Sequence, residues 1–276
     1  MSANPGVVER PLLPGAEPFS YPGTERTGVL LVHGFTGSPA EMRPVAEALA
    51  AHGIGSEGIR LRGHGTHPDD MLGCTYQDWI EDVEAALDRL LTQYQQAIIV
   101  GLSMGGTLAL NVAARRANDS RVVGVVPICS PLVLDDWRLG LVRFVSRFVK
   151  WQGWGVPDIK DRSAWDRHVG YRRFRLGTVT CLLDLMQETR ERLAAVRQPI
   201  LVAQAREDHV VPARNAELIR SSVSSAECRL LLLDNCYHVV TVDYAAAELN
   251  AEIVRFVQRL NTRGQAETTD ADTASA

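Results

Sequence analysis

The sequence predicts an α/β protein whose central, mostly parallel sheet is flanked by helices. Short apolar runs alternate with segments of helical periodicity along most of the 276 residues. The apolar runs are nearly continuous, which is typical of strands buried on both faces of a sheet. Strands that alternate with helices favour parallel pairing through crossover connections. A composition of 46% hydrophobic and 22% charged residues can also fill a sizeable core.

The first half of the chain supplies four predicted strands and three helices. The apolar run GVLLV (28–32) reads as a buried strand, and residues 77–94 carry apolar side chains at helical spacing. In chain order we expect a strand over 28–32, a helix over 39–51, a weaker strand over 54–59, a helix over 77–94, a strand over 97–100, a helix over 104–117 and a strand over 122–128.

The same alternation resumes after residue 178. We expect a helix over 179–195, a strand over 199–204, a helix over 213–222, a strand over 229–233 and a helix over 245–260. Residues 1–130 and 179–262 would together form the α/β core. The last residues, 263–276, are polar, and we expect them to be disordered.

Residues 131–178 break this pattern and hold four of the five tryptophans. Within them, residues 139–150 would form a helix with Phe144 and Phe148 on its apolar face, opposite a basic face. An ordinary surface helix would show the same periodicity. An aromatic-rich insertion between two strands favours a cap, in which Phe144, Phe148 and Trp151 roof a substrate pocket. The basic residues, Arg143, Arg147 and Lys150, would then make transient contact with anionic lipid surfaces.

Charge and cysteine content narrow the class of protein. A net charge of -4 gives no electrostatic reason to expect nucleic acid as a partner. The five cysteines have no CxxC spacing, so we expect free thiols and a reducing, cytoplasmic location. No signal peptide is apparent, and no apolar run approaches membrane-spanning length. We therefore expect a soluble protein.

The segment GLSMGG (101–106) places Ser103 between a buried strand and a helix of small residues. Gly-x-Ser-x-Gly is a weak signal alone, but a strand–turn–helix context is what a nucleophilic serine requires. The turn would strain the serine and expose its hydroxyl, and Gly101 and Gly105 would avoid clashes that a Cβ would cause. The helix N-terminus favours a developing anion.

A serine hydroxyl needs a base to take its proton and an acid to orient that base. Asp208 follows the strand over 199–204, and His238 follows the strand over 229–233, which is the expected order of acid and base. All three side chains would then meet at the carboxyl edge of the sheet. Glu207 and Asp243 remain rivals to Asp208 as the acid.

Two further segments bear on the site. HGFTG (33–37) follows the first predicted strand, so the N–H groups of Phe35 and Met104 are candidates for an oxyanion hole. His64 and His67 lie in RGHGTHPDD, but no third ligand accompanies them. We therefore expect no metal at these two histidines.

Five segments together resemble the bacterial monoacylglycerol lipase and carboxylesterase family of α/β-hydrolases. They are LLVHGFTGSPAEMRPVAEALAAHG, RLRGHGTHPDDM, GLSMGGTLAL, EDHVVP and NCYHVVTVDY, and the resemblance runs from about Pro14 to Leu260. It implies an α/β-hydrolase fold with a helical cap inserted after the sixth strand. It also implies a triad at the positions of Ser103, Asp208 and His238, and a cap that admits one acyl chain, with no metal or cofactor.

One position departs from the family pattern. Members that select monoacylglycerols resemble one another in an acidic cap residue three positions before a tyrosine, which binds a glycerol hydroxyl. Alignment on Tyr171 puts His168 at this position, and the nearest acid is Asp166. We expect His168 to contact the substrate.

The expected activity is hydrolysis of a small-molecule carboxylic ester with a single acyl chain, preferably a monoacylglycerol, through an acyl-enzyme intermediate. A general carboxylesterase for short and medium-chain esters is the alternative within this class. A non-catalytic binding protein on the same scaffold is a third candidate, and a haloperoxidase-like or acyltransferase activity would use the same triad. The acyl chain length and the oligomeric state stay open.

Overall fold

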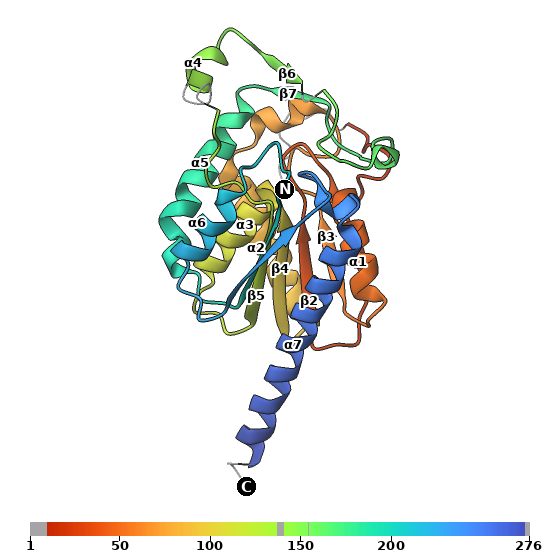
Figure 1. The fold of residues 1–276 in the computed structure, drawn as a ribbon, viewed down its shortest axis with the longest axis vertical. Helices are drawn as coiled ribbons and strands as arrows, with labels where there is room; N and C mark the ends of the chain where they lie inside the picture. Colours follow the sequence, from red (N-terminus) through yellow and green to blue (C-terminus); the bar gives the residue numbers. More distant parts are fainter. Residues whose placement is uncertain (1–9, 137–140, 154, 274–276) are drawn as a thin grey trace, which may run out of the picture.

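The computed structural model describes residues 10–136, 141–153 and 155–273. Seven strands form one sheet in the order β1-β3-β2-β4-β5-β8-β9, and all neighbours are parallel except β1 and β3. The strands are β1 (Phe19–Tyr21), β2 (Thr27–Val32), β3 (Ser56–Ile59), β4 (Gln96–Leu102), β5 (Val122–Ile128), β8 (Ile200–Ala205) and β9 (Cys228–Leu233). Figure 1 shows this sheet as the centre of the molecule.

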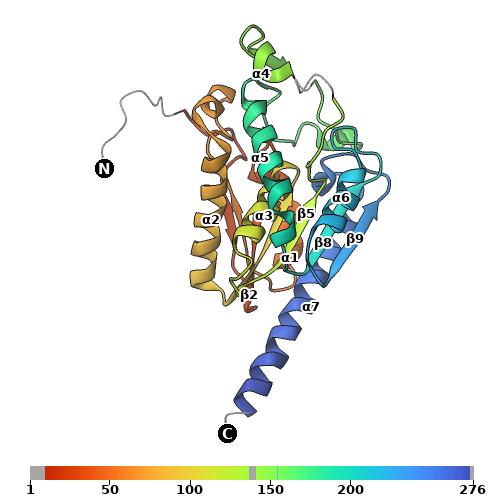
Figure 2. The ribbon, with the colours of Figure 1, turned by 90° about the vertical axis from the view of Figure 1, so that its left-hand side faces the viewer.

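Helices cover both faces of the sheet because the central strands are apolar on both sides (Figures 1 and 2). In β2, Leu30 and Val32 belong to one buried cluster, whereas Val29 and Leu31 belong to the other. Helices α2 (Tyr76–Gln93), α3 (Met104–Arg115), α5 (Thr178–Arg192) and α6 (Arg214–Ser222) contribute to the first cluster. Helices α1 (Arg43–Ala50) and α7 (Ala246–Thr273) contribute to the second.

The strands and helices predicted for the core are confirmed to within a few residues. Local signals explain this agreement, as at α2, where Thr75 and Asp78 form a capping box that fixes the first turn. The expectation for the last residues was wrong, because α7 continues to Thr273. The sequence beyond residue 262 has no proline, and a helix already formed extends at low cost. Residues 274–276 lie outside the described part.

The segment between β5 and α5 differs from the predicted helical cap. It holds one short helix, α4 (Val142–Val145), a 3-10 turn over Arg162–Ala164, and a two-stranded antiparallel sheet of β6 (Trp151–Gly153) and β7 (Arg173–Arg175). The helix predicted over 139–150 is thus reduced to four residues, with 139 and 140 outside the described residues. Glycine and proline interrupt the segment at Gly153, Gly155 and Pro157, which favours turns over helix.

The insertion also follows the fifth strand of the chain within the described residues, where the sixth was expected. Pro11, Pro14 and Pro18 stand before β1, and proline cannot donate to a strand ladder, so these residues form no additional strand.

All five cysteines are free thiols. Among the helices of the described residues, we find none that is both long and apolar enough to cross a membrane.

Candidate active site

Ser103 lies on a sharp turn between β4 and α3 at the carboxyl edge of the sheet. Its φ is +54°, in a region that side chains other than glycine rarely adopt. A Cβ on Gly101 would lie 2.1 Å from the carbonyl oxygen of Gly105, and a Cβ on Gly105 would lie 2.2 Å from that of Val32. The predicted strain and the predicted need for both glycines are therefore confirmed.

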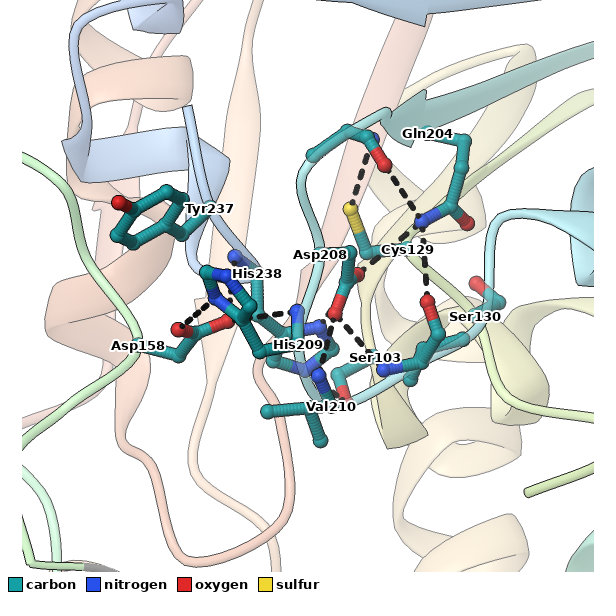
Figure 3. A network of polar contacts seen from close by, with 12 residues as sticks. Ser103, Cys129, Ser130, Asp158, Gln204, Asp208, His209, Val210, Tyr237 and His238 are labelled. Carbon is teal, nitrogen blue, oxygen red and sulfur yellow. Dashed lines mark hydrogen bonds and ion pairs between the residues drawn. The ribbon is translucent and has the colours of Figure 1, made fainter. Parts of the chain in front are cut away.

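Ser103, His238 and Asp208 form one chain of hydrogen bonds (Figure 3). His238 Nε2 lies 2.9 Å from Ser103 Oγ, and His238 Nδ1 lies 2.8 Å from Asp208 Oδ2. A carboxylate can only accept, so Nδ1 carries the proton and donates to Asp208. Nε2 is then free to accept the hydroxyl proton of Ser103, which is the arrangement that a nucleophilic serine needs.

The charges around His238 set its protonation. Burial lowers the pKa of His238, but the charge and hydrogen bond of Asp208 outweigh it, with a further contribution from Asp158, and the net shift is upward from 6.5. Burial likewise raises the pKa of Asp208, but the charge and hydrogen bond of His238, with backbone donors, bring it below 3.8. The pair therefore favours ionised Asp208 and stabilises an imidazolium.

The surroundings of Asp208 distinguish it from its two rivals. Gln204 donates to Asp208 Oδ2 at 3.1 Å, so the carboxylate is held from both sides. Glu207 instead pairs with Lys160 at 2.8 Å. Asp243 accepts backbone N–H groups from four residues of two loops, Lys160, Asp161, Tyr237 and Tyr244. Asp208 is thus the acid that contacts the His238 ring.

The loop after β2 runs beside Ser103, as expected for an oxyanion hole. Gly34 donates its N–H to the buried carboxylate of Glu41 at 3.0 Å, and its carbonyl accepts from His33 Nδ1 at 2.9 Å. Within the described residues, neither the N–H of Phe35 nor that of Met104 is used by a hydrogen bond to another group. Both donors remain available to a bound oxyanion.

A cavity of about 310 Å³ opens above Ser103. Its lining combines the Ser103 turn, the loop after β2 and the cap, and it includes Phe35, Leu134, Val156, Trp165, His168, Tyr171, Leu182 and Val211. His168 lines this cavity, and its contact with substrate stays a prediction. The lining is mostly apolar, with a few polar groups beside the serine, which suits an acyl chain attached to an ester.

The predicted roof of Phe144, Phe148 and Trp151 was wrong, because none of the three lines the cavity. Phe144 is 61% and Phe148 is 72% exposed, and their rings pack against each other at 5.4 Å. Trp151 is half-buried beneath the guanidinium groups of Arg173 and Arg175. The aromatic content of the cap indicated a cover, but not which ring turns inward.

The two histidines considered for a metal have other contacts. His64 is buried among aromatic rings, and burial first, with His33 second, lowers its pKa to about 3. His67 caps the turn that follows it by accepting from Asp69 N. Cys129, Asp208 and His238 do place three donor atoms within 4.8 Å of one another. Burial raises the pKa of the Cys129 thiol well above its usual range, and a protonated thiol is a poor metal ligand.

Two site residues were not found from the sequence. Glu41 contacts Gly34 and His168, and Asp158 accepts from the backbone N–H of His238 at 3.1 Å and from the ring of His209 at 2.8 Å. Glu41 lies within one of the five segments that carry the family resemblance, but we predicted no role for it, and Asp158 lies outside all five. The one usable signal in the sequence was the position of Glu41, an acid about one helical turn after HGFTG.

Comparison with known proteins agrees with this geometry. The family described as "Serine aminopeptidase, S33" matches residues 23–244. The chain is 38% identical over 238 residues to a thermostable monoacylglycerol lipase of Bacillus sp. (strain H-257). This alignment covers 85% of this chain and 91% of the relative. It is 24% identical to a carboxylesterase of Bacillus subtilis (strain 168), over 89% of this chain and 97% of the relative.

A solved structure from a study of the metagenome-derived lipolytic enzymes LipS and LipT gives the same fold. It superposes with a TM-score of 0.85 and 35% sequence identity, covering 90% of this chain and 100% of that one. The residues that the family model matches, 23–244, include the Ser103 turn, the loop after β2 and the loops that carry Asp208 and His238. The chain belongs to this serine hydrolase family of the α/β-hydrolase fold.

Proposed function

We propose that this chain hydrolyses carboxylic esters of single acyl chains, with monoacylglycerol as the preferred substrate. The observation that carries the proposal is the hydrogen-bonded chain Ser103–His238–Asp208 at the base of a mostly apolar cavity. Relatives named monoacylglycerol lipase and carboxylesterase support the same activity.

The reaction follows from the positions of the proton donors and acceptors. Ser103 Oγ attacks the ester carbonyl carbon while its proton passes to His238 Nε2. The carbonyl oxygen becomes an oxyanion, which the N–H groups of Phe35 and Met104 stabilise. When the carbon–oxygen bond breaks, His238 returns the proton to the leaving alcohol. Water then attacks the acyl-enzyme with His238 as the base, which releases the fatty acid and restores the Ser103 hydroxyl.

Direct tests separate this activity from a non-catalytic role. A series of chromogenic acyl esters should be hydrolysed, and a fluorophosphonate should label Ser103. Ser103→Ala should lose labelling and about six orders of magnitude in kcat, because no hydroxyl remains for His238 to deprotonate. Retention of more than about one percent of the activity would contradict Ser103 as the nucleophile.

The preference for glycerol esters is tested separately. A polar partner for the free hydroxyls should make a monoacylglycerol a better substrate than the ethyl ester of the same fatty acid, because an unpaired polar site disfavours the ethyl ester. Equal kcat/KM values for the two esters would indicate a general carboxylesterase.

Since all five cysteines are free thiols, we also propose a cytoplasmic location.

The exposed rings of the cap support transient contact with anionic lipid. Phe144 and Phe148 face solvent next to the exposed cations Arg147 and Lys150. Apolar rings beside cations are typical of surfaces that rest on anionic headgroups without inserting deeply. The cap would thus bring the cavity to substrate dispersed in a lipid surface.

A further inference from the structure

The cap is fastened to the loop after β2 by a short segment, 168–171. Ser38 Oγ donates to the carbonyl of Val169 at 2.6 Å, and the N–H of Tyr171 donates to the carbonyl of Thr36 at 2.8 Å. Next to these bonds, His168 Nε2 lies 2.8 Å from Glu41 Oε1. The cap therefore touches the segment that holds the Phe35 N–H, through one charged and two neutral contacts.

Glu41 packs against that segment and also lines the cavity. It is only 5% exposed, and its Oε2 accepts the N–H of Gly34 at 3.0 Å. A Cβ on Gly37 would lie 2.3 Å from Oε2, so the carboxylate packs against the bare backbone of that glycine. The peptide after Gly34 carries the Phe35 N–H, so the bond to Glu41 fixes the direction of the neighbouring oxyanion donor.

The same carboxylate is close to the nucleophile. A Cβ on Gly34 would lie 3.4 Å from both Glu41 Oε2 and Ser103 Cβ. A negative charge here opposes the oxyanion that forms when Ser103 attacks, and low exposure strengthens the repulsion. The position suits the reaction only if a cation neutralises the carboxylate.

His168 is the group placed to do so. Burial lowers its pKa, but the hydrogen bond and charge of Glu41 outweigh burial, and the net shift is upward from 6.5. The other charged groups that act on the pair are His33 and His238 toward Glu41, and Arg172 toward His168. Burial lowers the pKa of His33, which stays neutral. His168 is thus the titratable group that contacts the carboxylate, and the upward shift of its pKa favours its cationic form.

We propose that Glu41 is a positioning residue for the oxyanion loop and that protonated His168 of the cap neutralises it. The proposal rests on the ester hydrolysis proposed above and adds a role for the cap in the chemical step. Activity should rise with pH as His238 loses its proton. It should fall again as His168 loses its own, because the bare Glu41 carboxylate then faces the oxyanion.

Charge removal from each side of the pair provides the test. The profile of kcat/KM against pH is measured for the wild type, Glu41→Gln, His168→Gln and the double variant, with a soluble chromogenic ester. Glutamine at 41 keeps an oxygen for the Gly34 N–H but carries no charge. Glu47→Gln and His52→Gln, both exposed on or beside α1, are matched controls and should match the wild type.

We expect His168→Gln to lose at least about tenfold in kcat/KM near neutral pH, since the carboxylate is then never neutralised. Glu41→Gln should lose the alkaline decline. The double variant should recover most of the activity that His168→Gln loses, because no charge is left to neutralise. An alkyl boronic acid, which forms a tetrahedral adduct on Ser103, should bind the variants in the same rank order.

Two results would overturn the proposal while the enzyme remains active. One is an alkaline decline that persists in Glu41→Gln, and the other is a double variant no better than His168→Gln. If His168→Gln does not fold, His168→Lys keeps a cation, and it should remain active with the decline moved to higher pH; an unmoved decline counts against the proposal. A wild-type chain without esterase activity would instead overturn the proposed function, and this inference with it.

Discussion

Replacement of Asp208 by asparagine should almost abolish the reaction, because the proton of the His238 ring would move from Nδ1 to Nε2. Asp208 Oδ1 accepts the N–H groups of Val210 at 2.9 Å and Val211 at 2.7 Å, while Oδ2 accepts from His238 Nδ1 at 2.8 Å and from Gln204 at 3.1 Å. Asparagine has one oxygen. To keep its hydrogen bonds with both backbone N–H groups, it must turn its NH₂ group toward His238 Nδ1 and the Gln204 amide, which are both donors.

The imidazole then relieves that clash by moving its proton to Nε2, which can no longer accept from Ser103. The expected loss is about 10⁴-fold in kcat, as in triads where the same change fixes the wrong tautomer. That factor corresponds to about 5 kcal/mol in the activation barrier. Loss of an acceptor for Gln204 should also lower the free energy of unfolding by about 1–3 kcal/mol.

The assay is kcat with a saturating chromogenic ester, together with a thermal melt to establish the folded fraction. Asp234→Asn, at a side chain that is 80% exposed, is the matched control and should leave kcat unchanged. Asp243→Asn removes acceptors for backbone donors of two loops, so it should lower the melting temperature more than kcat. Asp208→Asn within tenfold of the wild type, or an equal loss of kcat in folded Asp243→Asn, would refute the reasoning.

Three further outcomes are expected. Gly105→Ala should destabilise the fold by about 1–3 kcal/mol or more through overpacking against Val32, whereas Gly177→Ala, with open space at its Cβ, should melt like the wild type. The pKa of Asp208 is lowered from 3.8, so it stabilises the fold above that pH, and the melting temperature should fall as acid protonates it; a flat profile down to pH 3 would contradict this. Replacement of both Phe144 and Phe148 by serine should reduce co-sedimentation with phosphatidylglycerol vesicles but not hydrolysis of a soluble ester, and Leu72→Ser, exposed elsewhere, should reduce neither.

The sequence by itself determined the features that depend on neighbouring residues. Apolar periodicity marked the core strands and helices, because burial on one or both faces imposes the spacing. The strained turn at Ser103 was predictable from its glycines and its strand–helix context. Chain order placed Asp208 and His238 after successive strands, and parallel strands bring such loops to one edge of the sheet.

Only the tertiary structure decided which side chains meet across long sequence separations. Asp208 follows β8 and Asp243 follows β9, so each acid comes after a strand of the sheet, and only the paths of the two loops decide which one contacts the His238 ring. Glu41 and His168 are 127 residues apart, so no local pattern could join them. The cap shows the same limit. Its apolar periodicity predicted a helix over 139–150, but a segment that packs against little of the core takes its shape from a few tertiary contacts. These contacts leave Phe144 and Phe148 exposed to solvent.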